Sequence, residues 1–173
     1  MTFISAIALV EAIEQTLGLQ AKIKWPNDVM IDGKKTAGIL TEIKAEMERI
    51  YYIVVGIGIN ANNTRFPKAL RANVTSLALE AGRDVSRIQL VQALLHNFER
   101  WYQITKQNDI EHPFERWRAY SCTLGNRVHV NVGEETLEGL AIRLGANGSL
   151  YLLLDSGQEQ EILAGDVTMV ASV

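Results

Sequence analysis

The chain has 173 residues, 47% of them hydrophobic, and a formal net charge of −3. This size allows one good hydrophobic core, or a medium-sized domain and a small one. The acidic balance excludes a basic surface of the kind that binds nucleic acid or an anionic membrane. A single cysteine, Cys122, excludes an internal disulfide framework and favours the reducing cytoplasm.

Residues 1–17 are almost entirely apolar, as in a signal peptide or a membrane span. Neither fits, because no Lys or Arg precedes the run, Glu11 and Glu14 interrupt it, and a span needs about 20 apolar residues. The pattern predicts a soluble helix over 2–17 that ends at Gly18. Because this helix is hydrophobic nearly all round, we expect it to need protein on several sides.

Four strands, over 23–25, 29–31, 34–43 and 50–59, are predicted after this helix. Pro26 ends the first of them, since proline has no N–H for the strand ladder. Asp32-Gly33 is a strong signal for a two-residue hairpin, with a return strand over 34–43. A polar turn at 46–49 then leads to a β-branched and aromatic strand over 50–59.

Glycines interrupt these strands at Gly38, Gly56 and Gly58. A glycine inside a strand weakens the sheet unless another group must approach the backbone closely. We therefore interpret the three glycines as a bare floor for a flat ligand.

The second half of the chain changes from a helical to a strand pattern. Ser76 and Ser86 are typical helix caps, for a short helix to Ala81 and a longer one with apolar residues at helical spacing. A further helix is predicted over 111–120. From Gly125 onwards apolar residues alternate between turns, which predicts a small all-β barrel.

Three stretches of the sequence resemble the catalytic core of biotin protein ligases, the enzymes that attach biotin to acetyl-CoA carboxylase and related carriers. They are Lys24-Trp25-Pro26-Asn27-Asp28, the return strand Gly33-Lys34-Lys35-Thr36-Ala37-Gly38-Ile39-Leu40, and Gly56-Ile57-Gly58-Ile59-Asn60. The resemblance implies an α+β fold, with a mixed sheet and packed helices as in class II synthetases, followed by an SH3-like barrel. The corresponding domains are residues 1–122 and 123–173.

The resemblance also implies a reaction with ATP and Mg²⁺ in which biotin becomes biotinyl-5′-AMP and passes to a lysine of a biotin carboxyl carrier protein. Lys35 matches the family's catalytic lysine, and Asp28 is expected to orient the ligand or hold the magnesium-nucleotide. Biotin is expected to lie on Gly38, Gly56 and Gly58, with Leu40 as an apolar wall. Asn60 and Asn27 are expected at the nucleotide, and no resident metal site is predicted.

Biotin ligases also carry an upstream segment with a glycine-arginine-rich loop that closes over the ligand, and no such loop occurs in these 173 residues. We therefore expect a truncated catalytic domain, inactive alone, with an uncovered apolar side on helix 2–17 and a homodimer through a sheet edge. No winged helix-turn-helix for DNA and no membrane partner are expected.

Two alternatives stay open at this point. The first is a non-catalytic fragment that binds biotin or only dimerises, and the second is a lipoate-ligase-like enzyme that also forms an acyl-adenylate. A dinucleotide site at Gly56-Ile57-Gly58-Ile59-Asn60-Ala61 is rejected, because the following residues, which include Pro67, cannot start the required helix.

Overall fold

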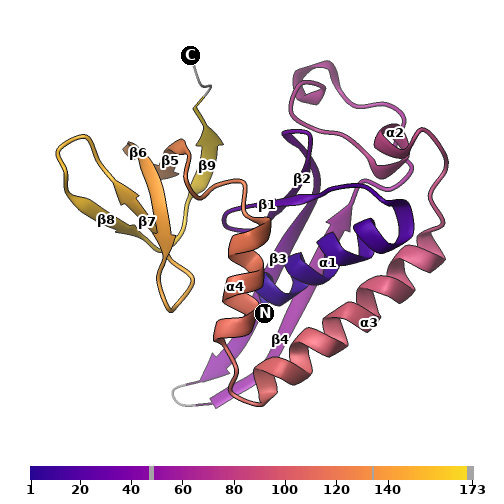
Figure 1. Ribbon diagram of the computed structural model, residues 1–173, viewed down its shortest axis with the longest axis horizontal. Coiled ribbons are helices and arrows are strands. Elements are labelled where there is room, and N and C mark those ends of the chain that lie inside the picture. Colours follow the sequence, from indigo (N-terminus) through magenta and orange to yellow (C-terminus); the bar gives the residue numbers. More distant parts are fainter. Residues whose placement is uncertain (47–48, 134, 171–173) are drawn as a thin grey trace. The chain divides into compact units, whose positions relative to one another are not determined.

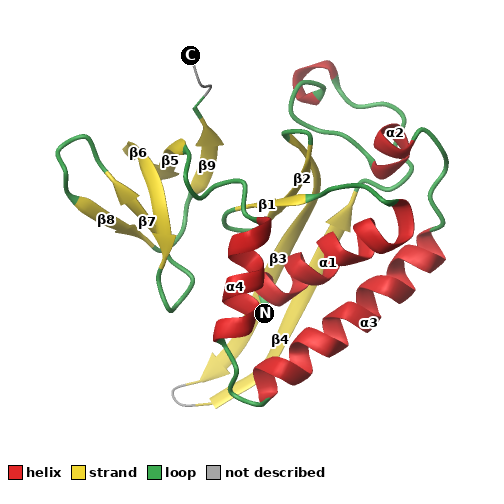
Figure 2. Ribbon diagram, viewed as in Figure 1, coloured by secondary structure: helices red, strands yellow, loops and turns green. Residues whose placement is uncertain are grey.

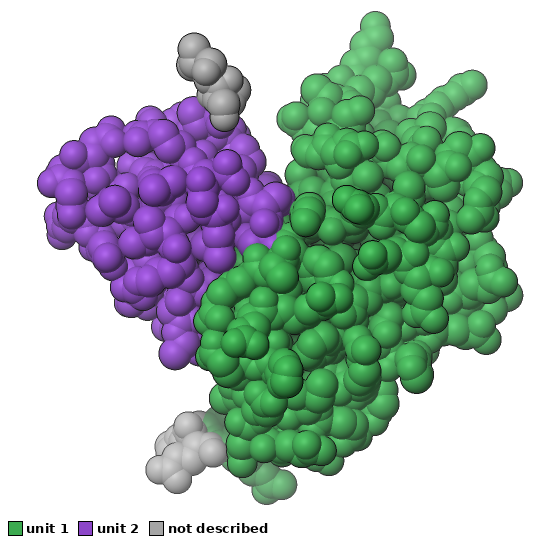
Figure 3. Space-filling view, in the orientation of Figure 1, with its two compact units in different colours: residues 1–23, 27–120 green, residues 24–26, 121–173 purple. Residues whose placement is uncertain are grey.

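The computed structural model of the chain describes residues 1–46, 49–133 and 135–170. The chain divides into two compact units, which Figure 3 shows in different colours. The first unit comprises residues 1–23 and 27–120, and the second comprises residues 24–26 and 121–173. A short piece of the Lys-Trp-Pro-Asn-Asp stretch therefore belongs to the second unit, although the rest of that unit begins only at Ser121.

The first unit is a sheet covered on one face by helices (Figures 1 and 2). Its strands, in the order β1-β2-β3-β4, are β1 (Lys22–Lys24), β2 (Asp28–Ile31), β3 (Lys34–Glu46) and β4 (Arg49–Ile59). Its helices are α1 (Thr2–Leu17), α2 (Leu77–Ala81), α3 (Arg87–Lys106) and α4 (Glu111–Tyr120), with a 3₁₀ turn at Lys68–Leu70. Helix α1 contacts β2 and β3 on one side and α3 and α4 on the other.

The hairpin predicted at Asp32-Gly33 is confirmed. Ile31 lies opposite Lys34, and the two turn residues have φ angles of 47° and 74°. Positive φ at both central positions is the two-residue turn whose twist suits a hairpin. The turn predicted at 46–49 falls partly on residues 47 and 48, which lie outside the described residues.

The expectation of a mixed sheet needs correction. The pairings described for β2 with β3 and for β3 with β4 are antiparallel. Hairpin connections impose this arrangement, since a parallel neighbour needs a long crossover. The described parallel pairing is limited to an isolated bridge between Lys35 and Val74.

The prediction that helix 2–17 has an uncovered apolar side is wrong. Nine residues of α1, Ile4 to Val10 with Ala12 and Ile13, are buried, with at most 4% exposure for the apolar ones. Phe3 at its start stacks on Trp117 of α4 at a ring distance of 5.0 Å. The hydrophobic circumference is covered because α3 and α4 pack on the side that the sheet leaves open.

One carboxylate joins the three long helices. Glu11 of α1 accepts hydrogen bonds from Arg100 and from the Trp101 indole N–H at 2.8 Å, both on α3, and from Arg116 Nε of α4 at 3.1 Å. Its side chain is only 12% exposed, whereas the two arginines are about half exposed. Charge-assisted hydrogen bonds to a mostly buried carboxylate are stronger than neutral ones.

We expect Glu11→Ala to lower the free energy of unfolding by about 2 kcal/mol, because it removes three charge-assisted partners while the exposed arginines regain water. The measurement is urea unfolding followed by far-ultraviolet circular dichroism. Glu14→Ala, an exposed position on the same helix, is the control and should change stability by less than about 0.5 kcal/mol. Equal effects of the two substitutions would contradict a role for Glu11 as the link between helices.

The second unit contains an antiparallel sheet in the order β8-β7-β6-β5-β9. Its strands are β5 (Arg127–Val132), β6 (Glu135–Leu144), β7 (Leu150–Leu153), β8 (Glu159–Ile162) and β9 (Asp166–Met169). The predicted closed barrel is not formed among the described residues. The sheet stays open because β9 pairs with β5, so β8 and β9 are its two edges.

Trp25 is part of the core of this second unit. Its side chain is 1% exposed, and its indole N–H donates to the Gly148 carbonyl at 3.0 Å. Its backbone N–H donates to the Thr123 hydroxyl at 2.8 Å, and the Lys24 ammonium donates to the Val167 carbonyl at 3.0 Å. The first residues of the Lys-Trp-Pro-Asn-Asp stretch therefore have a structural role within the second unit.

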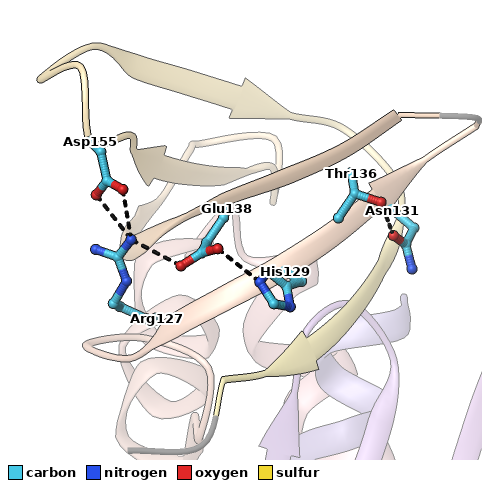
Figure 4. A network of polar contacts seen from close by, with 6 residues as sticks. All are labelled: Arg127, His129, Asn131, Thr136, Glu138 and Asp155. Atoms are coloured by element: carbon cyan, nitrogen blue, oxygen red, sulfur yellow. Dashed lines mark hydrogen bonds and ion pairs between the residues drawn. The ribbon is translucent and has the colours of Figure 1, made fainter.

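Figure 4 shows a polar network on the outer surface of this sheet. Arg127 bonds both Asp155 and Glu138, and His129 lies 2.9 Å from Glu138. Hydrogen bonds from His129 and from Arg127 hold the pKa of the Glu138 carboxyl below its ordinary value. The side chains are about 40–80% exposed, so these ion pairs add little to the free energy of unfolding.

Candidate active site

The site is built on an irregularity in the pairing of β2 with β3. Asp28 lies opposite Gly38, whereas Met30 lies opposite Lys35, so Thr36 is an extra residue on β3. Such a β-bulge changes which face the following side chains occupy, and bulges are frequent beside active sites. Here the bulge brings the Lys35 side chain to the face that carries Asp28 and Gly38.

Lys35 and Asp28 form an ion pair on this face. The Lys35 Nζ lies 2.5 Å from Asp28 Oδ1, and the exposed fractions of the two side chains are 44% and 11%. The lysine is thus open to solvent and to a ligand, while the carboxylate that holds it is mostly buried. This arrangement presents an oriented positive charge above the sheet.

The glycines predicted as a floor lie on the same face. Gly38 is opposite Gly58, and Leu40 is opposite Gly56, on neighbouring strands. Ile39, between these positions, points the other way and is 2% exposed, whereas Leu40 is 62% exposed. The structure therefore gathers Gly38, Leu40, Gly56 and Gly58 on the sheet face opposite the helices, beside Lys35.

The two asparagines predicted at the nucleotide both donate to the protein backbone. The Asn27 side-chain amide donates to the Ile39 carbonyl at 2.8 Å, which holds the turn before β2 against β3. The Asn60 side-chain amide donates to the Thr75 carbonyl at 3.1 Å and so joins the end of β4 to the segment before α2. Their expected contact with a nucleotide stays a prediction.

Sequence reasoning missed how the segment before α2 returns to β3 beside Lys35. Lys35 N–H donates to the Asn73 carbonyl at 2.8 Å, and Thr75 N–H donates to the Lys35 carbonyl at 2.9 Å. Beside this segment lies a cavity of about 270 Å³, lined among others by Lys34, Arg65, Arg71 and Glu80. The two neighbouring lysines thus face different surroundings, and no local signal in residues 61–76 indicates this return.

The described residues contain no group of three or more His, Cys, Asp or Glu side chains placed to hold a metal ion. In the same part of the chain, no helix combines the length and apolar character needed to cross a membrane.

The known proteins to which the chain is similar in sequence are named as ligases. The chain is 34% identical over 171 residues to the bifunctional ligase/repressor BirA of Bacillus subtilis, covering 98% of this chain and 52% of that protein. It is 28% identical to the biotin–[acetyl-CoA-carboxylase] ligase of Paracoccus denitrificans, covering 92% of this chain and 68% of that protein. The chain thus spans about half the length of its Bacillus relatives.

A solved structure has the same fold. The biotin protein ligase from Aquifex aeolicus in complex with biotin and ATP superposes with a TM-score of 0.82 at 26% identity, covering 99% of this chain and 71% of that one. The family model described as the biotin/lipoate A/B protein ligase family matches residues 2–60, which include Asp28, Lys35 and the glycine-bearing strands. On this evidence, residues 2–60 match the biotin/lipoate A/B protein ligase family, and the chain has the fold of the Aquifex biotin protein ligase.

Proposed function

We propose that this chain takes part in the ATP-dependent activation of biotin to biotinyl-5′-AMP and in its transfer to a lysine of a biotin carboxyl carrier protein. The observation that carries the proposal is the Lys35–Asp28 ion pair, held at 2.5 Å over a sheet face that lacks side chains at Gly38 and Gly58. It is supported by relatives named as biotin ligases and by the similar Aquifex structure with biotin and ATP.

The first step joins two anions, the carboxylate of biotin and the α-phosphate of ATP. It therefore needs fixed positive charge where the pentacoordinate phosphorus forms. A lysine about 4 Å from that centre stabilises it by roughly 4 kcal/mol at an effective dielectric constant of 20, before desolvation. In this proposal Lys35 supplies the charge and Asp28 orients it.

The glycine face suits the flat ring system of biotin, and the exposed Leu40 beside it supplies an apolar wall. Asn60 and Asn27 are proposed to border the nucleotide. Because Asp28 is already paired with Lys35, we propose that Mg²⁺ arrives on the phosphates of ATP, where it would neutralise their charge.

The second unit is proposed to correspond to the SH3-like domain, residues 123–173, with residues 1–122 as the catalytic part. A cytoplasmic location is proposed from the single cysteine and from the reaction itself. Because the 173 residues hold no glycine-arginine-rich loop, we expect slow adenylate formation and no measurable labelling of a carrier by these residues alone.

The deciding experiment is a single-turnover measurement with this chain in excess over radiolabelled biotin, with ATP and Mg²⁺, because even a slow reaction is then quantifiable. Formation of biotinyl-5′-AMP supports the proposal. Biotin binding without adenylate, seen by calorimetric titration, would instead favour the non-catalytic alternative. Adenylation of lipoate in preference to biotin would favour the lipoate-ligase alternative.

We also propose that the chain forms a homodimer through the open edge of β4. This strand is the last of its sheet, and Ile50, Tyr51, Tyr52 and Val54 on it are 50–60% exposed. An apolar cavity of about 510 Å³ lies beside it, lined among others by Ile53, Val55, Leu95 and Phe98. An unprotected apolar strand edge favours pairing with another chain.

Light scattering after size-exclusion chromatography tests this association. Leu95→Glu, which places a charge in the cavity wall, should convert the dimer to a monomer. Ile88→Glu, on the same helix but away from the cavity lining, is the matched control and should leave the dimer intact. A monomeric parent chain, or a dimer that survives Leu95→Glu, contradicts the proposed interface.

A further inference from the structure

Gly38 differs from the other glycines of the site in what surrounds it. A Cβ atom placed on Gly38 would lie 3.1 Å from Lys35 Cε and 3.2 Å from Lys35 Nζ, with Asp28 Oδ1 at 3.6 Å. The first two distances are shorter than ordinary contacts between carbon and a neighbouring heavy atom. A Cβ atom at this position would therefore crowd the end of Lys35, which would have to shift by a few tenths of an ångström, and a larger side chain would displace it further.

Gly56 and Gly58 do not have this restriction. A Cβ atom on Gly56 would be nearest to the Leu40 carbonyl oxygen at 3.8 Å, and one on Gly58 would be nearest to the Gly38 carbonyl oxygen at 3.9 Å. Both are ordinary van der Waals distances. None of the three glycines has a positive φ, so backbone conformation does not demand glycine at any of them.

The end of the Lys35 side chain lies beside Gly38 where it meets Asp28. Lys35 and Gly38 lie on the same strand, and the extra residue Thr36 between them turns the lysine to the glycine's face. Asp28 lies directly opposite Gly38 on β2, and both its Oδ1 atom and the end of Lys35 lie within 3.6 Å of the position that a Cβ atom on Gly38 would occupy. A side chain at residue 38 would therefore push the end of the lysine away from this position.

We propose that Gly38 is a positioning residue for Lys35: its missing side chain leaves the space in which the lysine reaches Asp28 and is held over the site. This role rests on the proposed function and deepens it, since a floor for biotin would be served equally by Gly58. A larger residue at position 38 could thus have two distinct effects, which are displacement of the Lys35 side chain and weaker binding of biotin.

The displacement should affect the reaction much more than the fold. The end of Lys35 is flexible and 44% exposed, so it can move aside without disturbing the core. The strength of a fixed charge in the reaction depends on its position, and a misplacement of about 1 Å can cost about a hundredfold in rate. Substitutions at Gly38 should therefore lower the rate at saturating biotin and ATP while thermal stability changes little.

The test compares Gly38→Ala and Gly38→Val with Gly58→Ala as the matched control. In single-turnover measurements at saturating biotin and ATP, the rate of adenylate formation should fall about tenfold for alanine and about a hundredfold for valine. In crystal structures, the distance from Lys35 Nζ to Asp28 Oδ1 should lengthen in Gly38→Ala and exceed hydrogen-bonding range in Gly38→Val. Gly58→Ala should keep that distance and instead weaken biotin binding in calorimetric titration.

Three outcomes overturn or separate the proposals. If Gly38→Val keeps the ion pair, the positioning role is wrong whatever the rate does. If Gly38→Ala weakens biotin binding as Gly58→Ala does, with no loss of rate at saturation, Gly38 is only part of the biotin floor. If the parent chain forms no adenylate, the proposed function fails, while the crystallographic comparison still decides whether Gly38 positions Lys35.

Discussion

Replacement of Lys35 by alanine is expected to slow the formation of biotinyl-5′-AMP by about a hundredfold or more, the usual effect of losing one preorganised electrostatic group. The reason is geometric, since Lys35 carries its charge over the glycine face and Asp28 holds it there at 2.5 Å. The measurement is the single-turnover rate with this chain in excess, followed by chromatography of the labelled adenylate. Biotin affinity, measured separately, should change far less than the rate.

Lys34→Ala provides the matched control, because it removes the same charge one residue away. Lys34 lies opposite Ile31 at the hairpin end and lines the cavity near Arg65 and Arg71, away from the Gly38 position. Its replacement should therefore change the rate by no more than a few-fold. Equal losses from the two substitutions would mean that general charge, and not the position of Lys35, supports the reaction.

Trp25→Ala is expected to destabilise the second unit by about 3–5 kcal/mol, the typical cost of truncating a buried tryptophan. Trp25 is 1% exposed and its indole N–H donates to the Gly148 carbonyl, so loss of the side chain leaves a cavity and one unpaired acceptor, while the backbone bond to Thr123 remains. A small domain has little stability to spare. Amide hydrogen exchange over residues 121–170 should accelerate by about a hundredfold or more.

Trp25→Phe distinguishes packing from hydrogen bonding. It keeps an aromatic ring in the core but loses the indole N–H that donates to the Gly148 carbonyl at 3.0 Å. We expect a cost of about 1–2 kcal/mol, mostly from the unpaired carbonyl and the smaller ring. Unchanged exchange over 121–170 in Trp25→Ala would show that residues 24–26 are not part of the second unit's core.

Features with a local cause could be predicted from the sequence. Gly18 and Gly82 end α1 and α2 in the left-handed conformation, with φ angles of 69° and 63°. The side chains of Ser76 and Ser86 accept hydrogen bonds from backbone N–H groups three residues on. In each case the signal and the structure that it specifies lie within a few residues, so no knowledge of distant parts is needed.

Features that depend on distant partners could not be predicted in this way. The apolar circumference of α1 indicates that it needs cover, but only the packing of α3 and α4 supplies that cover. Likewise, alternating residues predict the strands of the second sheet, but whether the sheet closes depends on which strand pairs with β9. Hydrophobic periodicity identifies the face to be buried and says nothing about the partner that buries it.

The Asp32-Gly33 hairpin and the glycine-bearing strands follow from the sequence alone, and the family motif predicts Lys35 as the lysine of the site. Strict alternation along β3 would place Lys34, not Lys35, on the face of Gly38, since successive side chains of a strand point to opposite faces. The tertiary structure reverses this, because Thr36 is accommodated as an extra residue opposite β2. A bulge is a property of two paired strands, so only the pairing decides which lysine meets Asp28.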